Sequence, residues 1–583
     1  MNTGAVEKGR RADSPETGGR QAAMTASHES GRDLPHEAAP AAAAERLWLA
    51  AVLAGFVLAA VYVNPWRETA TSDDWAYALT CWHFADTGRY VPHDWIAANM
   101  PFQAWWGALF VKVLGKSFGA LRLSTLAMAV IGLLAFHGLA RESGTSAKRS
   151  AWLVLGLSAS PLFVRLSFTF MTNIHFLSLV LAAMFLFARG LRRDSAAAVF
   201  AGSLAAAAAI LVRQFGVGLI PALLGVWILG ERRAQRLPIV LLGCLAPLCA
   251  GAWQAWMGLR HPWWGATYSM TIQSFYMGER GLVLANAVVR VALALQYMAL
   301  FALPFVLAAG GSLVRGQSRV RRAMAVASVA ICLSIVALWQ HLRGGSPWMP
   351  YLPWNFDAVT RWPAAARAAI TVLASIGAVA LARIFWLRWF GAGGWRAMSP
   401  AARFVDLASL FVMSLHMVLY QLGDEYLLVL LPLTLMALAR HIPTQRTWSV
   451  RLAAAGCVVV WGLSAEWTRA SLAAGEAQWQ AAEGLCQAGI PRKQVCGPWT
   501  WVAYDRFDDY LQRINRRPVR DLKSFWVQWL PDQLARARFC VTAAPEGPPE
   551  GIWIVRRRIP YAGPWFGEAF VYVFERRGNA AAD

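Results

Sequence analysis

Two adjacent carboxylates, Asp73 and Asp74, follow shortly after the first long apolar run of the chain, Leu47 to Val63. A carboxylate within hydrogen-bond reach of an acceptor hydroxyl can remove its proton and so make it a nucleophile. Two neighbouring acids also raise each other's pKa, because like charges disfavour the ionised form. A simpler interpretation is structural, since Ser72 or Asp73 can cap the N-terminus of a helix. The pair therefore predicts either a general base at a membrane boundary or a helix cap.

The composition indicates that a lipid bilayer surrounds most of the chain. Of the 583 residues, 57% are hydrophobic and only 15% are charged, and the mean hydropathy is +0.40. A soluble globule would be left with too much apolar surface. The net charge of +22 comes from short basic clusters between apolar runs. Nucleic-acid binding is excluded as a function, because it requires basic residues gathered in one stripe or domain.

Apolar runs long enough to cross a bilayer predict a mainly α, polytopic membrane protein. A spanning helix needs about 20 predominantly apolar residues, and hydropathy gives about 13 such spans. The first run, Leu47 to Val63, follows a polar tail without a small-residue cleavage site, so we expect an uncleaved anchor. The other runs are centred near Ala129, Gly156, Val180, Ala205, Pro221, Gly243, Leu295, Val329, Ser375, Phe411, Leu431 and Val458.

The basic residues between these runs predict the topology. Clusters such as Arg141, Lys148 and Arg149 recur in alternate loops, and loops with this excess of Lys and Arg face the cytoplasm. With the N-terminus inside and an odd number of spans, the loop that holds Asp73 and Asp74 and the C-terminal segment both face outward. The Ala- and Arg-rich composition is typical of a GC-rich bacterium. We therefore expect a bacterial inner-membrane protein whose outer side is periplasmic.

Changes in composition divide the chain into three parts. Residues 1–45 have almost no large apolar side chains and are predicted to be a disordered cytoplasmic tail. Residues 46–466 form the predicted transmembrane domain, in which residues 64–120 are a first periplasmic loop with short helices along the membrane surface. Residues 467–583 contain short alternating segments and predict a small α/β periplasmic domain.

The cysteines do not indicate a metal site. The eight cysteines contain no Cys-x-x-Cys motif, and most lie in apolar runs as small core residues. Cys486, Cys496 and Cys540 lie outside these runs. A disulfide between Cys486 and Cys496 is compatible with an extracytoplasmic location, although spacing alone does not fix the pairing.

The predicted first outer loop contains "DDWAYA", then "GRYVP", then "MPFQAWWGAL". This order resembles the first-loop signature of the GT-C class of membrane glycosyltransferases, in particular the lipid A aminoarabinose transferases and the protein O-mannosyltransferases (family 39-like). The residues that match are Asp73, Asp74, Tyr77, Gly88, Pro92, Pro101, Trp105 and Trp106. Met100 stands where that family usually has Lys, and Phe102 stands where it has a second Pro.

A second part of the resemblance lies late in the chain. "DEYLLVLLP" at residues 424–432 is similar to the family's Arg-Tyr-Leu element, with Glu425 in place of Arg. The resemblance covers residues 1–230 in order, together with this late element. It implies a GT-C fold with the catalytic acids in the first outer loop.

The resemblance implies transfer of a sugar from a polyprenyl-phosphate donor to a glycolipid, glycan or protein acceptor, by an inverting single displacement. The sugar would be a hexose or a pentose. Asp73, which matches the family's first acid, would be the general base. Asp74 would orient Asp73, raise its pKa or bind a cation. Tyr77, Pro101, Trp105 and Trp106 would line the substrate pocket together with Asn173 and His175 from the second outer loop.

Positive charge is needed to stabilise the departing phosphate. Arg165 and Arg213 are the first candidates, because a charge within or beside an apolar span needs a reason. Arg280 and Arg343 lie in predicted outer loops and come next, as do Arg260 and Arg361. The alternative for each arginine is snorkelling to lipid headgroups.

The second outer loop leaves the use of a metal open. Asn173 stands where the family often has an Asp, and an amide can accept a hydrogen bond but provides no charge for a metal ion. A divalent cation is therefore neither indicated nor excluded as a cofactor. His416 and Asp406, embedded in a later apolar run, are predicted to make structural hydrogen bonds.

Two other functions stay open at this stage. A transporter or lipid flippase would be expected to show internal repeats, broken helices and charges near the middle of the bilayer. The chain instead gathers its acids and arginines near one predicted face. A non-catalytic relative that binds a polyprenyl lipid for a partner enzyme is the other alternative, and Met100 and Asn173 favour it.

Overall fold

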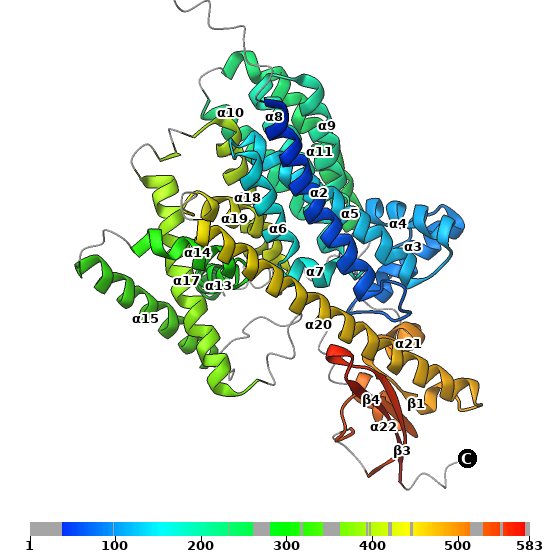
Figure 1. The fold of residues 1–583 in the computed structure, drawn as a ribbon. Helices are drawn as coiled ribbons and strands as arrows, with labels where there is room; N and C mark the ends of the chain where they lie inside the picture. The colour runs from blue at the N-terminus through cyan, green and yellow to red at the C-terminus, as the bar shows by residue number, and fades with distance from the viewer. Residues whose placement is uncertain are drawn as a thin grey trace, which may run out of the picture.

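Long apolar helices make up most of the described chain (Figure 1). The computed structural model describes residues 38–96, 98–230, 233–260, 280–314, 319–341, 362–391, 394–395, 398–417, 422–442, 447–513, 529–548 and 552–577. Its α-helices are α2 (Ala38–Val63), α3 (Asp74–Thr87), α4 (Pro101–Leu114), α5 (Phe118–Glu142), α6 (Ala147–Ser158), α7 (Pro161–Ser167), α8 (Thr172–Arg193), α9 (Ala196–Ile210), α10 (Leu219–Ile228), α11 (Arg233–Arg260), α13 (Arg280–Phe301), α14 (Leu303–Val314), α15 (Arg319–His341), α17 (Ala364–Phe390), α18 (Pro400–Met417), α19 (Leu431–Ala439), α20 (Thr447–Gln487), α21 (Trp499–Arg513) and α22 (Leu530–Arg536). The strands are β1 (Val495–Cys496), β2 (Phe539–Thr542), β3 (Trp553–Ala562) and β4 (Glu568–Arg576).

The chain is a multi-pass membrane protein. Within the described residues, six helices are long and apolar enough to cross a membrane, and eight segments qualify if each of two bent helix pairs counts as one span. Every centre predicted from hydropathy lies in a helix. Several of these helices, such as α9, are shorter than a full crossing requires. The figure of about 13 spans therefore stays a prediction, whereas the mainly helical, polytopic fold is confirmed.

Prolines explain where the two bent pairs break. α6 and α7 meet at 66°, and Pro161 is the first residue of α7. α13 and α14 meet at 86°, with Pro304 at the second position of α14. A proline donates no backbone hydrogen bond and disfavours helical geometry in the residue before it, so it begins a new helix rather than continuing the old one.

The helix at the N-terminal end begins earlier than the sequence predicts. α2 covers Ala38–Val63, whereas the first apolar run was expected to start at Leu47. Of the predicted disordered tail, residues 1–37 lie outside the described residues. The last residues of that tail form the first turns of α2 instead, because they are mostly alanine, the best helix former.

Two short helices, α3 and α4, form the segment between α2 and α5, as the sequence predicts (Figure 1). α3 ends at Gly88, whose left-handed backbone (φ 66°) lets its N–H donate to the carbonyl of Phe84. α4 begins at Pro101, which suits a first helical position because its missing N–H would have no partner there. Ser117 caps α5 by accepting a hydrogen bond from the backbone N–H of Ala120 at 3.0 Å.

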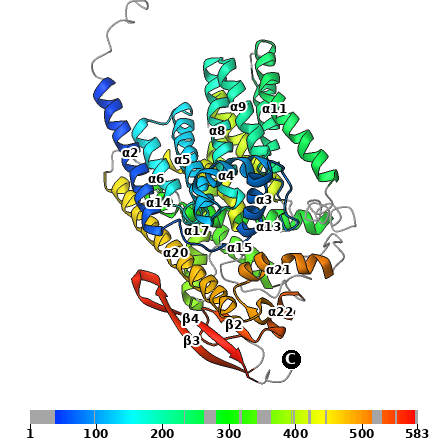
Figure 2. The ribbon, with the colours of Figure 1, turned by 90° about the vertical axis from the view of Figure 1, so that its right-hand side faces the viewer.

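A four-stranded sheet follows the helical bundle, at the far end of α20 (Figures 1 and 2). Its order is β1-β2-β4-β3, in which β1 and β2 are parallel and the other neighbours are antiparallel. The boundary expected between residues 466 and 467 falls inside α20, which runs without a break from the bundle to the sheet. The sheet is therefore attached through a helix rather than through a flexible linker.

The C-terminal segment packs directly against the loop that holds the paired acids. Both contribute to one hydrophobic core, separate from the core of the helical bundle. Phe507 of α21 lies against the rings of Trp75, His93 and Trp95, with centroid distances of 5.6, 5.3 and 5.4 Å. The loop is thus held in place from its outer side by a segment that lies more than 400 residues later in the sequence.

Replacing Phe507 by Ala should detach this support. A buried Phe→Ala change costs about 3–5 kcal/mol, and Phe507 is only 4% exposed. We expect a clear fall in the thermal unfolding temperature of the detergent-solubilised protein, and faster proteolysis after residue 87. The control is Trp565→Ala, because Trp565 is 68% exposed. Equal effects of the two changes would contradict the packing described.

Candidate active site

The carboxylate of Asp73 does not cap α3. Asp73 occupies the N-cap position, but its side chain makes no capping hydrogen bond. Its Oδ1 instead accepts a hydrogen bond from the indole N–H of Trp95 at 2.9 Å. Burial raises the pKa of Asp73, and the bond from Trp95 opposes that rise. The side chain is half-buried, and a raised pKa makes its carboxylate a stronger base.

Asp74 is more deeply buried than Asp73, with 1% of its surface exposed. Its Oδ1 accepts the backbone N–H of Thr71 at 2.6 Å, which closes the turn before α3. Burial raises the pKa of Asp74 to about 7, and the Arg122 guanidinium and the backbone of Thr71 and Phe170 oppose the rise. The two acids are therefore not equivalent: Asp74 faces the interior, whereas Asp73 is partly open.

Arg122 is a site residue that the sequence prediction missed. It lies in the first turns of α5 and is 1% exposed. Its guanidinium donates to the backbone carbonyls of Phe168 (3.0 Å), Pro65 (3.2 Å), Arg67 and Thr69. It also attracts the carboxylate of Asp74. The sequence could have indicated Arg122, because a charged side chain near the start of an apolar span is costly and therefore usually functional. The same argument singled out Arg213.

A second charged centre surrounds Arg213, which follows α9. The Arg213 Nε donates to the hydroxyl of Thr172 at 2.6 Å. Its guanidinium lies over the ring of Tyr426, 4.8 Å from the centroid. Tyr426 and Glu425 belong to the 3-10 helix η3 (Asp424–Leu430), and the charges of Arg213 and Asp73 act on both of them. The charges of Asp73 and Arg213, which lie far apart in the sequence, thus act on the same two residues of η3.

The second-loop residues lie at the start of α8, beside this centre. The Asn173 Nδ2 donates to the backbone carbonyl of Glu425 at 3.4 Å. His175 is fully buried and packs edge-on against Phe170, with the ring centroids 5.7 Å apart. Asn173 therefore lies within the charged centre, whereas His175 lies in the packed interior beneath it.

The remaining predicted pocket residues have mixed surroundings. Tyr77 is buried in the core that α3 shares with the C-terminal segment. Pro101 begins α4, and Trp105 is 47% exposed on that helix. Trp106 donates its indole N–H to the carbonyl of Ser124 at 2.9 Å, which ties α4 to α5. These positions fix the loop structurally, and Trp105 alone presents a large exposed ring.

The structure describes the side chains of only some of the other candidate arginines. Arg165 of α7 approaches the hydroxyl of Ser471 on α20 at 3.4 Å. Arg260 stacks on Trp256 of its own helix at 4.6 Å. Arg280 begins α13, but its side chain lies outside the described residues, as do Arg343 and Arg361 entirely.

Two buried polar residues of α18 make structural contacts, as predicted. The Asp406 carboxylate accepts hydrogen bonds from Arg388 at 2.6 and 2.8 Å and from the indole of Trp389 at 2.9 Å. The His416 Nδ1 lies 2.8 Å from the carbonyl of Val412. The His416 ring also stacks with Phe215 at 3.9 Å. Asp406 is thus paired with Arg388, and the ion pair and hydrogen bonds offset part of the cost of burying its charge.

Among the described residues, no group of three or more His, Cys, Asp or Glu side chains is arranged to hold a metal ion. At the second-loop position, Asn173 provides an amide and no charge.

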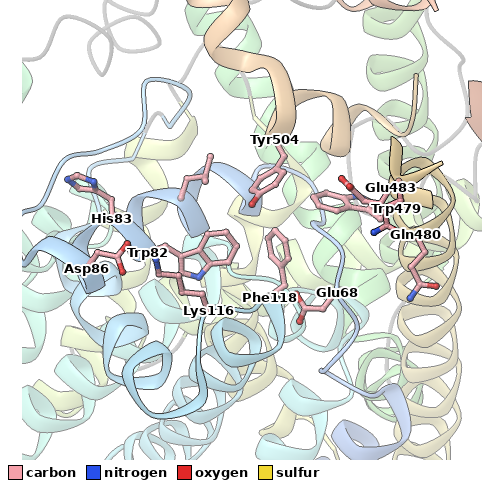
Figure 3. Close-up of a pocket in the computed structure, with 12 residues that line it drawn as sticks. Glu68, Trp82, His83, Asp86, Lys116, Phe118, Trp479, Gln480, Glu483 and Tyr504 are labelled. Atoms are coloured by element: carbon pink, nitrogen blue, oxygen red, sulfur yellow. Dashed lines mark hydrogen bonds and ion pairs between the residues drawn. The ribbon is translucent and has the colours of Figure 1, made fainter. Parts of the chain in front are cut away.

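A groove of about 870 Å³ lies between α3, the start of α5, α20 and α21 (Figure 3). Neither Asp73 nor Asp74 is among the residues that line it. Aromatic rings of Trp82, Phe118, Trp479 and Tyr504 line it, with a polar rim that includes Glu68, Asp86, Lys116 and Glu483. An α-helix has 3.6 residues per turn, so the α3 residues that line the groove lie roughly 80–180° from Asp74 around the helix axis. The groove is therefore on a different face of α3 from Asp74.

The raised pKa of Asp74 predicts a pH-dependent stability. In the unfolded chain this carboxyl ionises near its ordinary pKa of 3.8, whereas in the fold its pKa is about 7. The folded state therefore holds a proton that the unfolded chain releases, and stability falls as the pH rises between these values. The slope is at most about 1.4 kcal/mol per pH unit.

Asp74→Asn should remove this penalty. We expect the difference in unfolding temperature, variant minus wild type, to increase in favour of the variant from pH 4.5 to pH 8. Asp86→Asn, a change at an exposed position of the same helix, is the control. A difference for Asp74→Asn that stays constant with pH would show that the carboxyl is ionised throughout.

Comparisons with known proteins agree with the resemblance seen in the sequence. Residues 98–256 match the family model described as "Dolichyl-phosphate-mannose-protein mannosyltransferase". This range includes Arg122, Asn173 and Arg213 but not the two acids. None of the curated protein sequences matches the chain.

Three solved structures are similar in fold at low identity. ArnT from Cupriavidus metallidurans bound to undecaprenyl phosphate is 16% identical, with a TM-score of 0.42, and the match covers 92% of this chain and 99% of that one. The same protein in the apo state is 16% identical, with a TM-score of 0.43 and coverage of 91% and 98%. Archaeal oligosaccharyltransferase AglB from Archaeoglobus fulgidus is 13% identical, with a TM-score of 0.36 and coverage of 80% and 59%.

These scores and identities are too low to carry a functional conclusion by themselves. The family model rests on the sequence alone, and its range contains α4, α5, α8 and the arginine of the second charged centre. The resemblance of this chain to the superfamily of GT-C glycosyltransferases that includes the dolichyl-phosphate-mannose-protein mannosyltransferases is thereby confirmed.

Proposed function

We propose that this membrane protein transfers a sugar from a polyprenyl-phosphate donor to an acceptor, a glycolipid, a glycan or a protein. The observation that carries the proposal is the convergence of three segments on η3. The charges of Asp73, from the loop before α3, and of Arg213, from the turn after α9, both act on Glu425 and Tyr426 of η3, and Arg213 also donates to Thr172 at the start of α8. A half-buried carboxylate and a fixed guanidinium are the two groups that this transfer needs.

In the proposed reaction, Asp73 is the general base. An acceptor hydroxyl gives its proton to the Asp73 carboxylate while its oxygen attacks the anomeric carbon of the sugar. The bond from that carbon to the phosphate oxygen breaks, and its electron pair leaves with the polyprenyl phosphate. A single displacement of this kind inverts the anomeric centre, whether the sugar is a hexose or a pentose.

Arg213 stabilises the leaving phosphate. Thr172 holds its Nε and Tyr426 covers one face of its guanidinium, so the orientation of the charge is set before the donor arrives. Electrostatic groups that are already oriented contribute most to the transition state. Arg165, Arg280 and Arg343 stay secondary proposals for the lipid phosphate: Arg165 reaches toward Ser471 of α20, and the side chains of Arg280 and Arg343 lie outside the described residues.

We place the active site on the periplasmic side of a bacterial inner membrane. The support is the alternation of basic loops, which assigns the loop before α3 to the outer side. The C-terminal sheet domain packs against that loop through Phe507, so both lie on the same side of the membrane. The donor's sugar would then be presented at the outer membrane boundary.

The alternative of a non-catalytic lipid-binding relative keeps specific support. Glu425 lies within the electrostatic reach of Arg213, where its carboxyl group competes with a phosphate whenever it is ionised, and Asn173 provides an amide where the family often has an acid. Both features suit a relative that binds a polyprenyl lipid without catalysis. A transporter or lipid flippase is less well supported, since the buried ion pair of Asp406 and Arg388 is closed by direct hydrogen bonds.

Asp73→Asn separates catalysis from lipid binding. The amide keeps a hydrogen-bond acceptor for Trp95 but cannot take a proton, so we expect transfer to fall by about 10²–10⁴-fold with unchanged membrane insertion. The measurement is mass spectrometry of envelope glycolipids, glycans and glycoproteins from a deletion strain that carries each variant. Asp86→Asn is the matched control on the same helix. Undiminished product with Asp73→Asn would exclude this base.

Arg213→Gln tests the phosphate site against Arg165→Gln. Loss of a charge-assisted hydrogen bond costs about 1.5–3 kcal/mol, which corresponds to roughly 10–150-fold in donor affinity. We expect this loss for Arg213→Gln and less than a threefold change for Arg165→Gln. The measurement is inhibition of transfer by added undecaprenyl phosphate in detergent. A larger loss of affinity for Arg165→Gln than for Arg213→Gln would place the phosphate site at α7 instead.

A further inference from the structure

Two cysteines face each other in the C-terminal sheet. Cys496 is the last residue of β1, and Cys540 is its direct partner in the parallel strand β2. Neighbouring strands lie about 4.8 Å apart, and disulfides join residues whose Cα atoms are roughly 4.4–6.8 Å apart. Direct partners in adjacent strands also point their side chains to the same face of the sheet. The backbone of β1 and β2 therefore already has the spacing that a disulfide requires.

The side chains of the two cysteines meet in a buried environment. Only 7% of Cys496 and 6% of Cys540 is exposed. The thiol of Cys540 donates a hydrogen bond to the sulfur of Cys496, which lowers the pKa of Cys496 and raises that of Cys540. The guanidinium of Arg506 adds to the lowering at Cys496, and its Nη2 donates to the carbonyl of Val495 at 2.7 Å.

We propose that Cys496 and Cys540 form a disulfide that joins β1 to β2. The inference rests on the proposed periplasmic location of this domain, because thiols persist in the cytoplasm and are oxidised outside it. It replaces the pairing of Cys486 with Cys496 that the sequence allowed. Cys486 lies on α20, so it has no place in the register of the sheet.

The oxidation needs a partner with a disulfide of its own, such as a thiol–disulfide oxidoreductase of the periplasm. The Cys496 thiolate attacks one sulfur of that disulfide and expels the other as a thiolate, which leaves a mixed disulfide. Cys540 then loses its proton and attacks the Cys496 sulfur. The products are the Cys496–Cys540 bond and the reduced dithiol of the oxidant, which has taken up both electrons.

The bond would support the candidate active site indirectly. β1 is only two residues long, and within the described sheet it pairs with β2 alone. The chain leaves β1 directly into α21, whose Phe507 packs against Trp95, the hydrogen-bond partner of Asp73. Joining β1 to β2 would therefore fix the start of the helix that covers the loop.

The test is a count of protected thiols in the full-length protein, taken directly from membranes. Free thiols are blocked with N-ethylmaleimide in acid-quenched, denatured samples, and the remaining ones are reduced and labelled with a maleimide–polyethylene glycol. We expect two labels per wild-type chain and none for Cys496→Ser or Cys540→Ser. Cys486→Ser is the matched control and should keep both labels. Peptide mass spectrometry should show Cys496 linked to Cys540.

A second experiment tests whether Cys496 and Cys540 can pair, independently of the side of the membrane on which the domain lies. Purified, reduced protein is treated with oxidised glutathione, and the same count is made. If Cys486→Ser removed the two labels found for wild-type protein from membranes, the pairing of Cys496 with Cys540 would be overturned. It would also be overturned if the purified protein formed no disulfide with oxidised glutathione. Pairing with glutathione but free thiols in membranes would overturn the proposed bond and place the domain in a reducing compartment. Neither readout depends on sugar transfer, so a failure here and inactive Asp73 variants are distinguishable.

Discussion

The buried guanidinium of Arg122 is the interaction on which the loop of the paired acids depends. A charge taken out of water is costly unless hydrogen bonds and an opposite charge compensate for it. Arg122 has carbonyl partners on both sides, in the segment from Pro65 to Thr69 and at Phe168, and it attracts Asp74. These hydrogen bonds hold the backbone of the loop at Pro65, Arg67 and Thr69 against α5. The position of the acids is therefore set from beneath by α5.

This arrangement explains why two neighbouring acids have different tasks. Asp74 accepts the N–H of Thr71 and feels the positive charge of Arg122, so its carboxyl group is committed to the turn. Asp73 is the next residue back along the chain, and one step around the helix start turns its side chain toward Trp95. The first acid is thus the one available as the proposed general base, because the second is used for structure. A single acid at this position would have to do both.

Sequence reasoning predicted the parts of this structure that depend on local pattern. The apolar runs became helices, α3 and α4 appeared in the first loop, and the short alternating segments near the C-terminus became β3 and β4. It could not predict contacts between distant segments. Trp95 binds Asp73, and η3 approaches Arg213, only because of how the helices pack. Arg122 was missed for another reason, since its apolar surroundings were counted toward a span and the charge was not weighed.

The middle of α20 shows a continuity of backbone that the sequence alone conceals. The drop in hydropathy near Glu466 suggested a boundary, whereas in the structure Glu466 lies inside one continuous helix and forms an ion pair with Arg469 at 2.8 Å. Hydropathy indicates whether a segment is surrounded by lipid or by water, but it does not indicate where the helical backbone ends. A helix that leaves a bilayer and enters an aqueous domain changes composition without changing its hydrogen bonds.

The charge balance around Arg213 decides what the site can bind. Asp73 and Arg213 both act on Glu425, so two carboxyl groups share this neighbourhood with the guanidinium. A lipid phosphate adds another negative charge, and like charges in a half-buried site repel strongly. Binding is then favourable only if a carboxylate takes up a proton or if a further cation joins the centre. Donor binding and the protonation of these acids must therefore be coupled, because each proton taken up by a carboxylate removes a charge that opposes the phosphate.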